Sequence, residues 1–261
     1  MGTLIQIVGA PFTGKTVSAC TFPKPLDYFE LDVGGFESVK HARGADGRLI
    51  VPDWELIRRI KLNYKEAYDL SFLTAEKKDF ASGGSPAHTK RSIGLMKEFN
   101  AELKALFDSS KPAPKTVVID SGTTMFRIWK DAILHTNNIP ALRIADYGTL
   151  EGVLFRQFLP TLQALVAERV AWVILINHEN VDKDELTGQI VESPVGPSAN
   201  MGRALPKEFD EVWRQRVESN QYVWRTRKSG LFIGAGSRLS LPDPISPATF
   251  QELEKHLKEV K

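Results

Sequence analysis

Residues 5–20, IQIVGAPFTGKTVSAC, constrain the fold of this chain more than any other stretch. The first of these residues are apolar and β-branched, which predicts a strand buried on both faces of a parallel sheet. The strand pattern stops at Gly9, and Gly14, Lys15 and Thr16 follow after a spacer of four residues. A strand, a G-x-x-x-x-G-K-T loop and a segment that can be helical, in this order, indicate a phosphate-binding loop.

Each residue type in the loop has a chemical role towards phosphate. The glycines let successive backbone N–H groups point at phosphate oxygens, and the helix that begins near Lys15 adds the positive end of its dipole. We expect Lys15 to reach the β- and γ-phosphates and Thr16 to bind Mg²⁺. A turn without a ligand needs neither the lysine nor the hydroxyl. The residues expected to bind ATP are Gly9, Ala10, Pro11, Phe12, Thr13, Gly14, Lys15, Thr16 and Val17.

A second acid for the magnesium ion follows another apolar run. In KTVVIDSGTTMF, residues 116–119 predict a buried strand, and Asp120 falls where that strand ends. The carboxyl ends of parallel strands meet at one edge of a sheet, so Asp120 is expected beside the phosphate-binding loop. We predict that Asp120 and Thr16 hold the metal and that Asp120 takes part in catalysis.

Composition limits the class of protein and its partners. The 34 Lys and Arg residues nearly balance the 32 Asp and Glu residues, so the formal net charge is only +2 and any site for a polyanion must be local. The single cysteine, Cys20, excludes an internal disulfide bond. No apolar run is long enough to predict a membrane span. These features predict a cytoplasmic protein without membrane contact.

The order of predicted elements indicates one α/β domain. The 261 residues, 42 % of them hydrophobic, suit a single compact domain that covers 1–261. Predicted strands at 25–31 and 170–176 alternate with helical patterns at 150–166 and 247–260. The segment 53–107 looks mostly helical, and we expect a helical insertion there.

Six pieces of the chain, taken in order, resemble RecA-like P-loop ATPases. They are GAPFTGKT, FPKPLDYFELDVGG, TVVIDSGTTM, VILINHEN, MGRALPKEFDEVW and GSRLSLPDPISPATF. Within that group they resemble phage-encoded RecA-like nucleotide-binding proteins, some of which act in recombination by single-strand annealing. The resemblance implies an α/β fold with a RecA-like core, whose mainly parallel central sheet is flanked by helices. It also implies ATP and Mg²⁺ as ligands, ATP hydrolysis, assembly into a homo-oligomeric filament or ring and, for a phage protein, the host cytoplasm.

The resemblance assigns roles to two further regions. In the RecA core, the polar residue after the strand that ends in Ile-Asn senses the γ-phosphate, and the long loop that follows touches DNA. The corresponding residues here are His178 and the loop 182–203.

One position departs from the family pattern. RecA-like enzymes carry a glutamate just past the second strand that polarises the attacking water, in an Asp-x-Glu arrangement. In LDVGG, Asp32 matches the aspartate, and Gly34 stands where the glutamate is expected. We therefore choose Asp32 as the water-orienting acid and expect slow hydrolysis with normal nucleotide binding.

A DNA site requires Lys, Arg and aromatic side chains in the contacting loops. The candidates are Arg143, Tyr147, Lys183 and Arg203. Acidic residues are more numerous than basic ones in the loop 182–203. We therefore expect a single subunit to bind DNA weakly and only an oligomer to bind it strongly. In WRTRKSG, the basic residues either form an arginine finger for a neighbouring subunit or protect the edge of a hairpin.

Two functions remain open from the sequence. One is a DNA-stimulated ATPase or annealing protein whose nucleotide state controls assembly on single strands. The other is an ATPase that drives assembly or remodelling of a protein partner without nucleic acid. A small-molecule kinase is a distant third, because neither an acceptor pocket nor an arginine-rich lid can be assigned.

Overall fold

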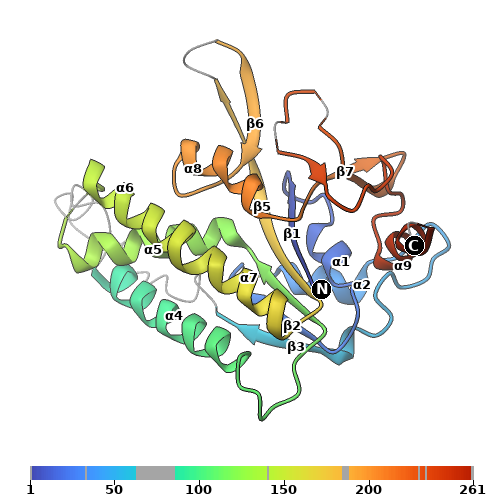
Figure 1. The fold of residues 1–261 in the computed structure, drawn as a ribbon, viewed down its shortest axis with the longest axis horizontal. Coiled ribbons are helices and arrows are strands. Elements are labelled where there is room, and N and C mark those ends of the chain that lie inside the picture. Colours follow the sequence, from blue (N-terminus) through green and yellow to red (C-terminus); the bar gives the residue numbers. More distant parts are fainter. Residues whose placement is uncertain are drawn as a thin grey trace.

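The computed structural model describes residues 2–32, 34–62, 86–139, 141–183, 188–228, 230–232 and 234–259 (Figure 1). The strands are β1 (Thr3–Gly9), β2 (Leu26–Glu30), β3 (Ile57–Lys61), β4 (Thr116–Asp120), β5 (Trp172–Lys183), β6 (Ile190–Pro194), β7 (Glu211–Glu218), β8 (Gln221–Arg225) and β9 (Gly236–Ser237). The helices are α1 (Lys15–Ala19), α2 (Gly35–His41), α4 (Pro86–Ala105), α5 (Gly122–Thr136), α6 (Ile144–Glu151), α7 (Leu159–Glu168), α8 (Ala199–Ala204) and α9 (Phe250–Glu259). Shorter or wider helical turns are η1 (Trp54–Leu56), η4 (Gly152–Phe158) and η5 (Leu205–Glu208).

The central sheet has the strand order β3-β2-β4-β5-β1-β7-β8. From β3 to β7 every neighbouring pair is parallel, whereas β6, β8 and β9 pair antiparallel with their neighbours. Strand β5 lies between β1 and β4, so the carboxyl ends of these three strands meet at one edge. The predicted fold class, an α/β RecA-like core with a mainly parallel sheet flanked by helices, is confirmed.

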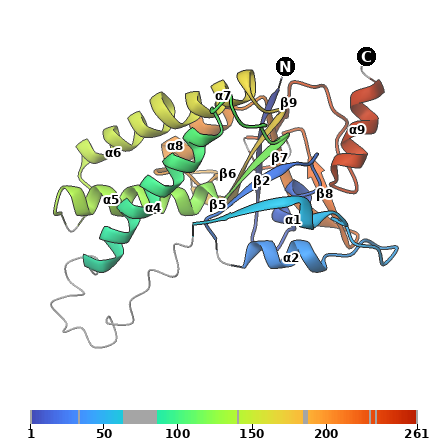
Figure 2. The same cartoon turned by 90° about the horizontal axis from the view of Figure 1, so that it is seen from below.

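Helices cover both faces of the sheet because side chains alternate along buried strands. On β1, Leu4 and Val8 pack into one apolar core with α4, α5, η4 and α7. Ile5 and Ile7 point the other way, into a second core with α1, α2 and α9. Figures 1 and 2 show the resulting three layers, with the sheet in the middle.

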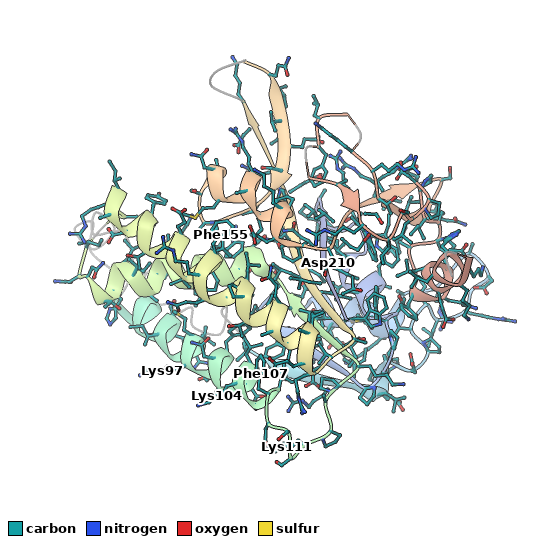
Figure 3. All side chains as sticks on the ribbon, viewed as in Figure 1. Lys97, Lys104, Phe107, Lys111, Phe155 and Asp210 are labelled. Carbon is teal, nitrogen blue, oxygen red and sulfur yellow. The ribbon has the colours of Figure 1, made fainter. Side chains whose placement is uncertain are left out.

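Aspartate 210 fixes β7 against the first residues of β1. Its carboxylate accepts the Leu4 N–H at 2.9 Å, and its own N–H donates to the Leu4 carbonyl oxygen at 3.0 Å. Figure 3 labels Asp210 beside the central strands. The two bonds set the register in which Val8 lies opposite Arg214.

The segment 53–107 is less helical than the sequence indicates. It contains α4 but also the edge strand β3, in which only Ile57 and Ile60 are buried. The arginines of β3 interrupt the apolar pattern of a buried strand. They are tolerated there because they bind acids of β2. Arg58 donates to Asp27 at 3.1 Å, and Arg59 pairs with Glu30. Residues 63–85 lie outside the described part of the chain.

No helix among the described residues is both long and apolar enough to cross a membrane.

Candidate functional site

The phosphate-binding loop runs from the end of β1 to the start of α1, as the sequence predicts. Gly14 has φ +80°, a conformation that residues with a side chain rarely adopt. A Cβ at Gly14 would lie 2.5 Å from the Tyr222 ring, and a Cβ at Gly9 would lie 2.6 Å from the carbonyl oxygen of Gln215. Phe12 is fully exposed at the outer side of the loop. Both glycines are therefore required by the packing of β7 and β8 against the loop.

Lys15 lies inside the curl of the loop. Its ammonium donates to the carbonyl oxygens of Gly9 at 2.9 Å and Ala10 at 2.6 Å. Burial lowers the pKa of Lys15 to about 8, and the nearby carboxylates of Asp120 and Glu179 offset this only in part. A buried cation whose hydrogen-bond partners in the described part of the chain are carbonyl oxygens is well placed to bind phosphate.

Thr16 and Asp120 meet although they come from separate motifs. The Thr16 hydroxyl donates to Asp120 Oδ2 at 2.5 Å, and the Tyr28 hydroxyl donates to the same oxygen at 2.7 Å. Burial raises the pKa of Asp120, and the two hydroxyl donors counteract this. Sequence reasoning missed Tyr28, because its place in an apolar strand gives no local sign of a polar partner.

Asp32, just after β2, and His178 on β5 meet beyond the end of β4, the strand that lies between β2 and β5. Ser121 donates to Asp32 Oδ2 at 2.8 Å, Thr124 donates to Oδ1, and His178 Nε2 lies 3.8 Å from Oδ2. Burial alone raises the pKa of Asp32, but the nearby His178 imidazole and the hydrogen bonds from Thr124 and Ser121 outweigh it and bring the pKa to about 2. Asp32 is thus a firmly ionised acid that orients its neighbours.

A charged quartet beside the loop has no counterpart among the sequence predictions. It consists of Glu179 on β5, Glu192 on β6, and Arg214 and Arg216 on β7. Arg214 Nε and Arg216 each lie 3.1 Å from the Glu179 carboxylate, and Arg214 also pairs with Glu192. Strand β1 lies between β5 and β7 and ends at Gly9. Beyond Gly9, the four charged side chains therefore link β5 directly to β7.

The expected loop 182–203 is instead a hairpin followed by a helix. Residues 179–183 of β5 and 190–194 of β6 pair antiparallel and form what we call the arm, which projects from the sheet edge in Figure 1. The segment 184–187 lies outside the described residues. Ser198 caps α8, where its Oγ accepts the N–H of Met201. Backbone pairing that sequence patterns do not reveal converts a polar, Gly- and Pro-containing segment into strands.

The four candidate DNA residues do not form one cluster. Lys183 is exposed at the end of β5, while Arg203 lies on α8. Arg143 directly precedes α6, and Tyr147 lies on it. The Arg143 guanidinium pairs with the Asp146 carboxylate at 3.0 Å. In Figure 1, α8 lies between α6 and the arm.

Four other basic residues are remote from the arm or paired with an acid. Figure 3 labels Lys97, Lys104 and Lys111 at the opposite end of the view from the arm. In the WRTRKSG segment, Arg225 donates to both carboxylate oxygens of Glu218, at 2.9 Å and 2.7 Å. This pairing across the β7–β8 hairpin favours the role of an edge residue for Arg225.

The donor set fits a nucleotide with magnesium better than a metal alone. Among the residues that the structure describes, no group of three or more His, Cys, Asp or Glu side chains could hold a metal ion. One hydroxyl and one carboxylate, Thr16 and Asp120, leave most of the coordination to phosphate oxygens and water, which is typical of Mg²⁺.

Comparison with known proteins identifies the family of the chain. A family model described as an AAA domain matches residues 1–239, a range that includes every strand of the sheet and ends before α9. Among solved structures, the crystal structure of the RadB recombinase is similar, with 16 % sequence identity and a TM-score of 0.44 over 89 % of this chain and 84 % of that chain. No curated protein sequence matches the chain.

Proposed function

Since the chain belongs to the AAA domain family and has a RecA-like P-loop core, we propose that it binds ATP with Mg²⁺ and hydrolyses it. One observation supports this most directly: Thr16 and Asp120 share a hydrogen bond beside the buried ammonium of Lys15. In this proposal, Lys15 binds the β- and γ-phosphates. Thr16 and Asp120 hold the magnesium ion, which supplies Lewis acidity and neutralises charge on the phosphates.

We further propose that Asp32 and His178 act at the γ-phosphate. His178 follows the strand beside β1 and lies opposite Gly9 in the register, so its imidazole is close to the place of the last phosphate. Asp32, with its low pKa, accepts hydrogen bonds and orients water rather than removing a proton from it. A weak base at this position predicts slow hydrolysis.

The proposed purpose of the ATPase is recombination or single-strand annealing, with nucleotide state controlling assembly on single-stranded DNA. The charges of the arm support this more than the sequence alone does. Two of its acids, Glu179 and Glu192, are neutralised by Arg214 and Arg216. The excess of acidic residues in this region therefore overstates the repulsion that a DNA backbone would meet.

Alternation along the arm separates its remaining charges. The register places Val181, Lys183 and Ile190 on one face, which we call the aliphatic face, together with the arginine-paired Glu192, and it places Asp182 on the other. Val181 is 59 % exposed and Ile190 is 53 % exposed. An aliphatic surface next to a lysine suits unstacked bases next to a phosphate, while Asp182 points away from it.

We retain a second candidate function, because the same aliphatic face also suits a protein partner. Exposed apolar residues that gather on one projecting element are typical of protein interaction sites. The alternative is therefore an ATPase that drives assembly or remodelling of a protein partner without nucleic acid, in the cytoplasm in either case.

Turnover measured with and without single-stranded DNA, together with particle size, separates the two. We expect DNA to stimulate hydrolysis and ATP to increase particle size on DNA. Lys183→Glu is expected to reduce the stimulation several-fold, and the control Lys97→Glu, an equally exposed lysine remote from the arm, to leave it unchanged. Turnover that DNA does not change at low salt would favour the protein-remodelling function.

A further inference from the structure

Three side-chain oxygen atoms meet at the proposed magnesium ligands. Asp120 Oδ2 accepts hydroxyl hydrogen bonds from Thr16 and from Tyr28, so Tyr28 reaches the acid from the side opposite the phosphate-binding loop. Tyr28 comes from the middle of β2, the strand next to β4, and is fully buried. Its ring packs against Phe36 of α2 with 5.2 Å between ring centroids.

The first residue of α2, Gly35, lies directly over these three oxygen atoms. A Cβ built on Gly35 would lie 3.3 Å from the Tyr28 hydroxyl oxygen, 3.4 Å from Asp120 Oδ2 and 3.5 Å from Thr16 Oγ1. The first of these distances is shorter than an ordinary van der Waals contact, so a methyl group at Gly35 would press on the oxygen atoms. It would also cover three polar atoms without offering any of them a hydrogen bond.

We propose that Tyr28 is a positioning residue for Asp120 and that Gly35 leaves the oxygen atoms of Thr16 and Asp120 uncovered for hydrated magnesium. Tyr28 acts only through the carboxylate: its hydrogen bond fixes the rotation of Asp120 and directs the acid towards Thr16. Gly35 acts by lacking a side chain. The proposal rests on the proposed ATPase function, because the metal arrives with the nucleotide.

The chemistry of magnesium favours this arrangement. Mg²⁺ demands regular octahedral geometry, gives up its water molecules reluctantly and is bound in nucleotide sites by one or two protein groups. Groups that orient a metal ligand commonly change metal affinity by 10- to 100-fold when they are removed. A hydroxyl that holds the ligand carboxylate, and a neighbouring residue without a side chain to cover it, favour such a site.

Two substitutions test the two parts of the proposal, one for Tyr28 and one for Gly35. Tyr28→Phe removes one oxygen atom and keeps the ring that packs on Phe36. Gly35→Ala adds one methyl group against the three oxygen atoms. Gly94→Ala is the matched control, because Gly94 is a helical glycine whose added Cβ would meet nothing within 4 Å.

The measurement is calorimetric titration of Mg²⁺ into each protein saturated with ADP, together with ADP binding in the presence of EDTA. For Tyr28→Phe and Gly35→Ala, we expect Mg²⁺ affinity to fall roughly tenfold, with ADP binding in EDTA unchanged and the control equal to wild type. Thermal melting shows whether each variant is folded. Conservation of Mg²⁺ affinity within about twofold in both folded variants would overturn the proposal.

The wild-type titration distinguishes the two levels of failure. A wild type that binds ADP equally with and without Mg²⁺ would refute the proposed magnesium-dependent function, and this inference with it. A wild type that responds to Mg²⁺, alongside variants that respond equally, would refute only the roles of Tyr28 and Gly35.

Discussion

The Thr16 hydroxyl and the Asp120 carboxylate form a 2.5 Å hydrogen bond between residues that lie 104 positions apart. The bond brings the start of α1 to the end of β4 across the intervening strand β5. It also leaves the lone pairs of the Thr16 oxygen free for a metal ion while its hydrogen is held by the acid. This hydrogen bond links the proposed phosphate-binding loop to the proposed metal-binding acid.

Asp120→Asn is expected to abolish magnesium-dependent turnover while nucleotide binding partly survives. The amide keeps the size of the side chain but removes the charge that attracts the metal, whereas Lys15 still binds the phosphates. ATP turnover and binding of a fluorescent ATP analogue, each with and without Mg²⁺, check this. Full turnover in Asp120→Asn would assign the metal acid to another residue.

Lys15→Ala is expected to abolish tight binding of ATP·Mg²⁺. Its ammonium lies inside the loop with only carbonyl oxygens as partners, and a charge-assisted contact to phosphate contributes roughly 1.5 kcal/mol or more. That corresponds to a loss of at least about tenfold in affinity. Equilibrium titration with ATP·Mg²⁺ measures it, and an affinity within about twofold of wild type would contradict the role of the loop.

ATP binding is also expected to take up a proton at alkaline pH. The pKa of Lys15 is about 8 without ligand, because burial disfavours its charge. A triphosphate favours the charged form, so its binding raises this pKa. Affinity should therefore be full below pH 8 and fall as the pH rises above it, since binding must then protonate the amine.

Calorimetry in two buffers with different protonation enthalpies, at pH 7 and pH 9, measures the uptake. We expect no proton uptake by Lys15 at pH 7 and uptake of most of one proton at pH 9. Lys15→Arg keeps its charge at both values and serves as the control. Equal heats in the two buffers at pH 9, after the contribution of ATP itself is subtracted in that control, would refute the low pKa.

The parts of the site that the sequence predicted are those whose chemistry lies in consecutive residues. The loop from Gly9 to Thr16 is a local motif, and Asp120 follows from the apolar run before it. The contacts of Tyr28 and Gly35 depend on strands and helices brought together by the sheet order, which a local pattern does not encode. Their positions are visible only once β2 lies beside β4.

The arm illustrates the same limit. The sequence around Lys183 has the Gly, Pro and acidic residues that are typical of a loop. These residues mask the alternation of apolar and polar side chains that accompanies strand pairing at Val181 and Ile190. One of the acids that argue against DNA binding, Glu192, is paired with the arginines of β7. Net charge counted along a segment is therefore a poor measure of the charge that a surface presents.

The last prediction concerns coupling between nucleotide and DNA through His178. This residue lies between Asp32 and the first residues of the arm, and Glu179 directly after it is held by Arg214. A γ-phosphate that moves His178 would thereby move the base of the arm. By linkage, ATP would tighten DNA binding by the same factor by which DNA tightens ATP binding.

His178→Ala is expected to leave both ligands bound but to abolish their mutual effect. Labelled single-stranded DNA is titrated with and without a non-hydrolysable ATP analogue, at two salt concentrations, for wild type and His178→Ala. Because each subunit offers few basic residues, binding should become steeply salt-sensitive only in assembled particles, since the salt slope is about 0.7 per phosphate neutralised on a single strand. Wild type that binds no DNA under any nucleotide condition at low salt would refute the recombination function and favour the protein-remodelling ATPase. DNA binding that the analogue enhances equally in His178→Ala would instead keep the function and move the coupling to another residue.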